Sequence, residues 1–187
     1  MLKTSMLGWI ARLAQDRRGV SAVEFALMAP MMIGLYLGCV EISDGVGADR
    51  KVSLTAGALA NLTAQVTTIS TTDRDDILAA SSAIVVPYSA TNLTMKVSCL
   101  KIDANGVATV KWGFARNTTA RTAGSTYSFN SNNSALDVNS SWLILSEVTY
   151  AYTPIVGYTI TGTISLSDQM FMSPRISAPT YNGITCT

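Results

Sequence analysis

The residues best placed to do chemistry lie in one short stretch near the N-terminus. Two arginines and Gly19 lead into an apolar run, and Glu24 stands at the start of that run. A carboxylate isolated in lipid is expensive. The cost falls near the membrane surface, where lipid headgroups or a nearby cation offset the charge. The position of Glu24 therefore predicts either a carboxylate that reaches the headgroups or one that meets a positive partner.

Other kinds of reactive residue are scarce in this chain. It has no histidine, which removes the commonest general base and the commonest metal ligand. No C-x-x-C spacing, G-x-S-x-G elbow, phosphate-binding loop or D-x-S-x-S metal motif occurs. The net charge of +1 does not favour nucleic acid. We expect no enzyme activity, no metal and no cofactor.

The chain has three cysteines, one in the apolar run and two in the later part of the chain. Cys39 lies inside the apolar run, whereas Cys99 and Cys186 lie in the later part of the chain. An even pair of cysteines in an exported domain predicts one disulfide. The alternative is two buried thiols.

A membrane helix must carry Glu24. Residues 25–40 contain no charge, and we assign residues 20–42 to the helix. Eighteen helical residues span about 27 Å, close to the thickness of a bilayer core. Four cations (Lys3, Arg12, Arg17 and Arg18) precede it. By the positive-inside rule the N-terminus is cytoplasmic and the rest of the chain lies outside the cytoplasm.

Three residues inside the apolar run bear on helix shape and packing. Pro30 is tolerated in a membrane helix with a local kink. Gly34 and Gly38 form a small-xxx-small pair, which permits close contact with another helix. A plain bend and ordinary small residues are the alternatives.

The stretch after Gly19 reads VSAVEFALMAP, with glutamate as its fifth residue. It resembles the class III signal of type IV pilin-like proteins. The form G-x-x-x-x-EFAL-x-x-P is similar to TadE/TadG-like proteins of the tight adherence (Tad/Flp) pilus system. The resemblance implies cleavage by a prepilin peptidase between Gly19 and Val20, with loss of leader residues 1–19. Glu24 would then pair with the new α-amino group of a neighbouring subunit.

The same resemblance implies a minor pilin or pseudopilin that acts in pilus assembly, initiation, or tip and surface adhesion. The expected partners are the prepilin peptidase, the major Flp pilin, other minor pilins, the inner-membrane Tad assembly platform and membrane lipid, without nucleic acid. The protein would cross the bacterial inner membrane once, with a cytoplasmic N-terminus and a periplasmic C-terminal domain, and would lie at the pilus tip or the cell surface after assembly. The alternative is an uncleaved, signal-anchored periplasmic binding module or secretion-system accessory protein.

The later residues predict a pilin-like α+β fold, with helices packed on an antiparallel sheet. Residues 43–86 are expected to form a helical stalk and a second helix, with residues 43–47 (SDGVG) loosening or breaking the stalk. Thr72 and Asp75 suggest the N-terminal cap of the second helix. After residue 87 the pattern changes to period two, as at Leu93, Met95, Val97 and Cys99, so residues 87–187 are assigned to an antiparallel β domain. Residues 116–139 are rich in Ser, Thr and Asn and predict a polar loop.

A second resemblance lies near the C-terminus. The V-T-Y-x-Y-x-P strand and a later P-R pair are similar to the corresponding region of TadE-like proteins. Both tyrosines lie on one face of the strand and are expected to pack in or beside the core. The arginine is expected to bind a carboxylate or a helix C-terminus, with simple solvation as the alternative. These residues are Tyr150, Tyr152, Pro154, Pro174 and Arg175.

Overall fold

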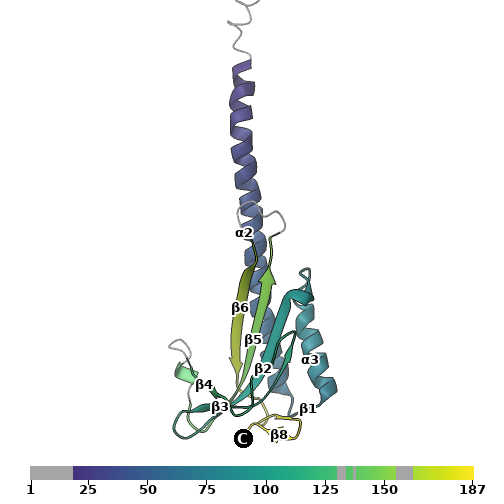
Figure 1. Ribbon diagram of the computed structural model, residues 1–187, viewed down its shortest axis with the longest axis vertical. Coiled ribbons are helices and arrows are strands. Elements are labelled where there is room, and N and C mark those ends of the chain that lie inside the picture. The colour runs from purple at the N-terminus through teal and green to yellow at the C-terminus, as the bar shows by residue number, and fades with distance from the viewer. Residues whose placement is uncertain (1–18, 130–133, 137, 155–161) are drawn as a thin grey trace, which may run out of the picture.

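The computed structural model describes residues 19–129, 134–136, 138–154 and 162–187. One long helix projects from a domain in which a second helix and two sheets pack against its lower half (Figure 1). The predicted α+β class is confirmed. Apart from Gly19, the expected leader of residues 1–19 lies outside the described residues.

The long helix, α2, runs without interruption from Val20 to Gln65. At 1.5 Å per residue its 46 residues extend about 69 Å. The expected break at residues 43–47 is wrong, because this stretch is helical throughout. The glycines there cost helix propensity, but contacts with the domain compensate for that cost, as described below.

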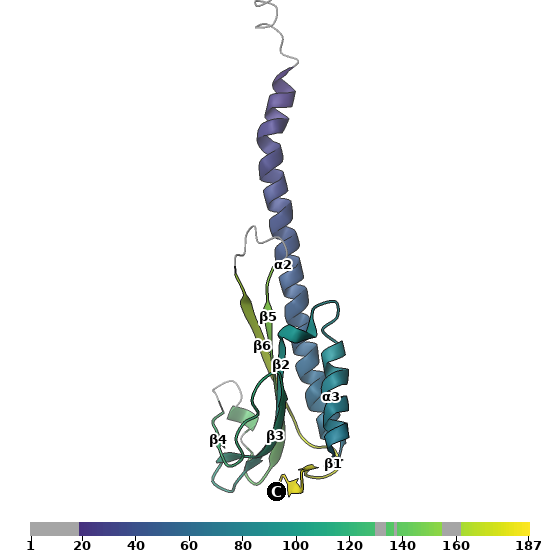
Figure 2. The ribbon, with the colours of Figure 1, turned by 45° about the vertical axis from the view of Figure 1, so that its right-hand side comes forward.

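The second helix, α3, runs from Thr71 to Ala83 and lies beside α2 (Figure 2). Its cap differs from the predicted Thr72–Asp75 pair. Ser70 caps the helix by accepting a hydrogen bond from the backbone N–H of Asp73 at 3.1 Å. The Asp73 carboxylate accepts in return from the Ser70 backbone N–H at 2.9 Å, so the capping box lies two residues earlier than predicted.

The main sheet is five-stranded, with the order β4-β3-β2-β5-β6 and antiparallel pairing throughout. A turn at residues 103–106 joins β2 to β3 as predicted, and a short 3₁₀ helix, η2, precedes β2. The strands are β2 (Leu93–Ile102), β3 (Ala108–Arg116), β4 (Thr126–Tyr127), β5 (Trp142–Tyr152) and β6 (Ile164–Met172); the 3₁₀ helices are η2 (Ala90–Asn92) and η3 (Ser134–Leu136).

The inner face of this sheet meets the helices. Alternate β2 residues point inward and are fully buried, which confirms the period-two prediction. Small residues on α2 let the helix approach closely, and the Ser146 hydroxyl on β5 donates to the Ala56 carbonyl of α2 at 2.6 Å. The inward β2 residues are Leu93, Met95, Val97 and Cys99.

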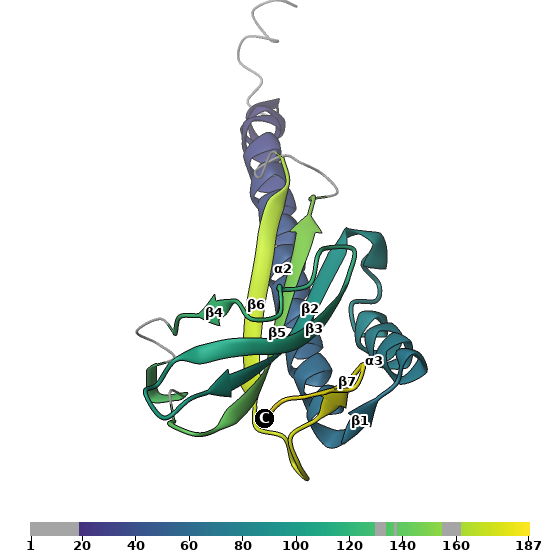
Figure 3. The same cartoon turned by 60° about the horizontal axis from the view of Figure 1, so that its bottom comes forward.

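A β-bulge gives the sheet a second, smaller core on its outer face. The β2–β3 register shifts between Cys99 and Leu100. As a result Trp112 joins the helix-side core, whereas Val110 joins a cluster with Leu100 on the opposite side. The chain that follows β3 crosses this outer face and carries β4 (Figure 3).

A three-stranded sheet lies at the end of the domain remote from the projecting helix. It pairs β1 (Thr68–Ile69) with β7 (Thr180–Tyr181), and β7 with β8 (Ile184–Thr185). The Trp112 indole N–H donates to the Pro179 carbonyl at 3.0 Å and ties this sheet to β3. The C-terminal segment is therefore part of the fold rather than a loose tail.

Candidate functional site

The first candidate site is the projecting part of α2. Its large apolar side chains are exposed on every side of the helix. For example, the exposed fraction is 50% for Val20, 66% for Phe25 and 69% for Tyr36. Only 11% of the most apolar 18-residue window is buried inside the structure. A helix that is apolar all round and unburied suits a bilayer or a bundle of other helices. It is compatible with a single-pass membrane anchor.

Gly19 and Glu24 lie at the tip of this helix. Gly19 is the residue that precedes α2, and a side chain added there would meet nothing within 4 Å. Val20 and Glu24 are exposed in the first two turns. In the described part of the chain the tip has no covering segment, so both the glycine and the carboxylate are accessible to another protein.

The helix-packing residues differ in their surroundings. Pro30 lies inside α2 without ending it. Gly34 is half-buried and Gly38 is buried. The glycine pair thus lies at the level where the domain begins to contact α2.

A polar clamp fixes α2 at the point where it enters the domain, and sequence reasoning missed it. We define the clamp as Asp44, Tyr88 and Tyr152. The Tyr88 hydroxyl donates to Asp44 Oδ1 at 2.8 Å, and the Tyr152 hydroxyl donates to Asp44 Oδ2 at 2.8 Å. The rings of the two tyrosines meet edge to face, with centroids 6.3 Å apart.

Gly45 and Gly47, where a break in the helix was expected, lie against the two tyrosines of the clamp. A side chain at Gly47 would lie 3.2 Å from the Tyr88 hydroxyl oxygen, and one at Gly45 would lie 3.6 Å from the Tyr152 ring. Small residues therefore let both rings approach the helix. The available signal was an acid, Asp44, followed by two glycines just after an apolar run.

Burial and hydrogen bonding keep the clamp tyrosines protonated. Burial is the larger cause and the hydrogen bond to Asp44 the second, and together they raise the pKa of Tyr88 to about 12. The same two causes raise the pKa of Tyr152 to about 12, with a smaller contribution from the nearby Glu41 carboxylate. An ordinary tyrosine hydroxyl is already a donor at neutral pH, and the raised pKa keeps both hydroxyls protonated further into the alkaline range.

The C-terminal residues that resemble TadE-like proteins lie against α2 in the structure. Tyr150 and Tyr152 are buried on the inner face of β5, and Pro154 is buried just after it. Pro174 is half-buried. The backbone N–H of Arg175 donates to the Ala64 carbonyl in the last turn of α2 at 3.0 Å.

The Arg175 side chain adds a second contact to the same helix. Its guanidinium donates to Asn61 Oδ1 at 2.8 Å. The guanidinium therefore meets an amide side chain near the end of α2, neither a carboxylate nor a helix-end carbonyl, and only the backbone of Arg175 bonds to the helix end. The pattern that resembles TadE-like proteins packs on both ends of the buried half of α2.

The structure joins Cys99 and Cys186 in a disulfide, with their Cα atoms 6.0 Å apart. The bond links inner strand β2 to the residue that follows β8. Cys39 is free and exposed on the projecting helix.

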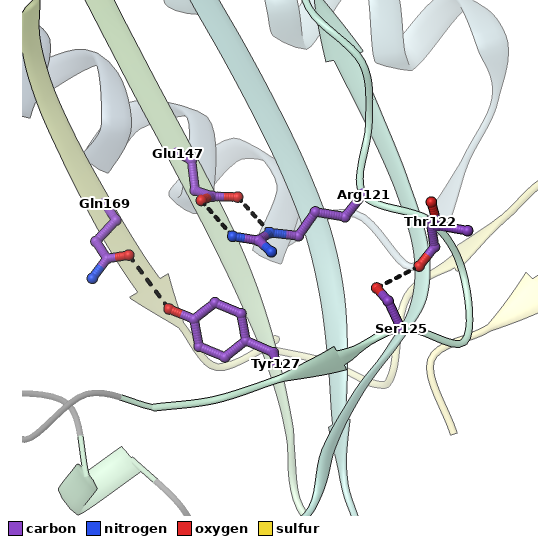
Figure 4. Close-up of polar contacts among 6 residues, drawn as sticks. All are labelled: Arg121, Thr122, Ser125, Tyr127, Glu147 and Gln169. Atoms are coloured by element: carbon purple, nitrogen blue, oxygen red, sulfur yellow. Dashed lines mark hydrogen bonds and ion pairs between the residues drawn. The ribbon is translucent and has the colours of Figure 1, made fainter.

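The second candidate site is a polar cluster on the outer face of the sheet (Figure 4). Arg121, from the predicted polar loop, donates from Nε and Nη2 to the two carboxylate oxygens of Glu147 on β5, each at 2.7 Å. The guanidinium also lies 5.1 Å from the centroid of the Tyr127 ring. Tyr127 in turn donates to Gln169 on β6 at 3.4 Å.

This cluster fixes the loop rather than leaving it in solvent. Burial first, and then the Glu147 charge, raise the pKa of Tyr127. Its ring packs edge-on against Phe129 and Phe171, over the outer core. The expected polar loop of residues 116–139 is thus anchored across its first half, and residues 130–133 and 137 lie outside the described residues.

Neither site gathers metal-ligating side chains among the described residues. Among the described residues there is no group of three or more Cys, Asp or Glu side chains that could hold a metal ion. The surface hollow beside Glu147 measures about 360 Å³ and is lined by hydroxyl, amide and carboxylate groups without a histidine.

The comparison with known proteins concerns the first site. Residues 19–58 match the family model of TadE-like protein. The chain is TadE-like over this segment. The match begins at Gly19, spans the projecting helix and the clamp aspartate, and ends within the buried half of α2. No curated protein and no solved structure matches the chain.

The TadE-like segment confirms the resemblance inferred from residues after Gly19. It associates the chain with the Tad pilus system and its components in general. The segment also contains Glu24, Pro30, Gly34 and Gly38.

Proposed function

We propose that this protein is a minor pilin or pseudopilin of a tight adherence pilus. A prepilin peptidase removes residues 1–19, and the helix behind Glu24 then joins other pilin-like helices. The protein crosses the inner membrane once and holds its α+β domain in the periplasm. Its role is non-catalytic, in assembly, initiation or adhesion at the pilus tip.

The observation that carries the proposal is the coincidence of three boundaries. Gly19 begins the family match, immediately precedes α2, and is followed by an unburied apolar helix with a carboxylate at its fifth residue. A peptidase that cuts at the cytoplasmic membrane surface requires an accessible bond followed by a membrane helix. Gly19 and Val20 are exposed among the described residues, and the apolar helix α2 follows them, which supports the proposal.

The partners follow from the exposed helix. The apolar side chains on all its faces can contact lipid before assembly. After assembly they can contact the helices of the major Flp pilin and of other minor pilins. The Tad assembly platform in the inner membrane would deliver the helix from one surrounding to the other. Gly38 is already buried within this chain, so of the glycine pair the half-buried Gly34 is the one left for close contact with another helix.

The mature N-terminus tests the proposal. We expect mass spectrometry of the protein from cells with active prepilin peptidase to find Val20 as the first residue. Cells that lack the peptidase should retain Met1 and serve as the control. Met1 retained in both strains would instead support an uncleaved, signal-anchored binding module or accessory protein.

A further inference from the structure

A groove lies beside the clamp, where the exposed helix enters the domain. It measures about 570 Å³ and is lined by Tyr36, Cys39, Val40, Ser43, Asp44 and Tyr88. The first three of these residues belong to the apolar part of α2, and the last three supply hydroxyl and carboxylate groups. The groove is therefore apolar at one end and polar at the other.

The polar end lies at the depth of lipid headgroups if the projecting helix spans a bilayer. From Val20 to Asp44 the helix rises about 36 Å, whereas a bilayer core is about 30 Å thick. Asp44 would then lie just outside the hydrocarbon, and Tyr36 would lie near its boundary. Tyrosines are enriched at this depth because the ring is apolar and the hydroxyl is polar.

The charge at the polar end is unbalanced within the described residues. The Asp44 carboxylate accepts hydrogen bonds from Tyr88 and Tyr152, both neutral, and takes part in no ion pair there. A carboxylate has about four acceptor positions, so two remain after these bonds. An ammonium group that carries N–H donors suits these positions, and the Tyr88 ring beside it adds a favourable cation–π contact.

We propose that this groove binds the primary ammonium headgroup of a phospholipid, phosphatidylethanolamine, with the acyl chain along Tyr36, Cys39 and Val40. Asp44 receives the ammonium, and the Ser43 hydroxyl donates toward the phosphate. The site would hold the domain at a fixed depth on the membrane surface. The inference rests on the membrane-anchor part of the proposed function but not on cleavage or assembly.

The test uses the purified full chain in nanodiscs of equal parts phosphatidylethanolamine, its N,N-dimethyl derivative and phosphatidylcholine. Native mass spectrometry then counts the lipids that stay bound. We expect the wild type to retain phosphatidylethanolamine roughly three- to tenfold over phosphatidylcholine, the effect of one charge-assisted hydrogen bond near water. The dimethyl lipid should fall between them, because it keeps one N–H donor.

Variants assign the effect to the groove. Asp44→Asn should bring the retention ratio to one, whereas Asp49→Asn, an exposed acid on the same helix outside the groove, should leave it unchanged. Equal retention of all three lipids by the wild type would overturn the proposal, and so would a preference for phosphatidylcholine. If Asp44→Asn does not fold, the wild-type series across the three headgroups decides the question alone. Because no peptidase or pilus protein is present, this result is independent of the proposed processing.

Discussion

Glu24 and Asp44 are two acids on one helix, and their surroundings differ. Glu24 is exposed at the tip, among apolar side chains. Asp44 is held by two tyrosine hydroxyls at the edge of the domain. The first carboxylate is thus available to a partner outside this chain, whereas the second already has a structural role inside it.

Glu24→Ala should leave membrane insertion intact and abolish incorporation into the assembled pilus, because in the proposed assembly the substitution removes the charge that pairs with a neighbouring α-amino group. Membrane fractionation and the sheared pilus fraction, both probed by immunoblot, measure the two outcomes separately. Glu24→Asp keeps the charge on a shorter side chain and should retain part of the incorporation. Wild-type assembly of the alanine variant would exclude the pairing role.

A glycine on β3 lies too close to the backbone of β2 to be replaced without a shift. A side chain at Gly113 would lie 2.8 Å from the Val97 carbonyl oxygen and 3.6 Å from the Arg121 carbonyl of the loop above it. At Gly57 on α2 a side chain would meet nothing within 4 Å. The same substitution therefore has opposite expected effects at the two positions.

Gly113→Ala should lower the free energy of unfolding by about 1–3 kcal/mol, the usual cost of overpacking. Gly57→Ala should raise it by about 0.5–1 kcal/mol, because alanine is the better helix former. Denaturant titration of the protein in detergent micelles measures both. A stabilised Gly113→Ala variant would show that the backbones of β2 and β3 do not approach each other as closely at Gly113 as described.

At the scale of elements, the loop after β3 behaves as part of the sheet. The backbone N–H of Val110 donates to the Ser125 carbonyl at 2.9 Å, and that of Gly124 donates to the Val110 carbonyl at 2.8 Å. The Arg121–Glu147 pair adds a bidentate contact to β5. The side chains of this pair are 33% and 23% exposed, so the pair is less screened than one at a fully open surface.

Arg121→Met should speed hydrogen exchange at residues 121–127 and lower the free energy of unfolding by about 1–2 kcal/mol, because Glu147 loses a bidentate partner. Arg74→Met is the matched control. Arg74 pairs with Asp75, which is 64% exposed, and makes a long hydrogen bond of 3.4 Å to the Tyr181 hydroxyl, so little stability should be lost. Hydrogen exchange is measured by mass spectrometry on both variants. Equal exchange rates of the peptides that cover residues 121–127 in the two variants would contradict the anchoring of the loop by Arg121.

At the scale of the whole molecule, the Cys99–Cys186 disulfide closes most of the domain. The two cysteines are 87 residues apart, and the bond attaches the C-terminal segment to the central strand. The segment also carries Arg175 to the end of α2. The disulfide therefore restrains the unfolded chain over the span from β2 to the C-terminal segment.

The double variant Cys99→Ala/Cys186→Ala should lower the free energy of unfolding by about 2–4 kcal/mol, as expected for a long closed loop. Cys39→Ala removes a free thiol from the projecting helix and should change little. Guanidinium titration of the three proteins measures the difference. Equal midpoints for the double variant and the wild type would rule out a stabilising role for the disulfide.

The sequence by itself determined the features that depend on near neighbours. The apolar run, the Gly19–Glu24 spacing and the alternation along β2 and β5 are local patterns, and the first two pointed to the TadE-like segment. Tertiary structure decided the rest. Asp44 meets residues 44 and 108 positions away, and its neighbouring glycines belong to a continuous helix because two tyrosine rings pack there. A local pattern records only the cost of a helical glycine, and the compensating contact exists only in the folded chain.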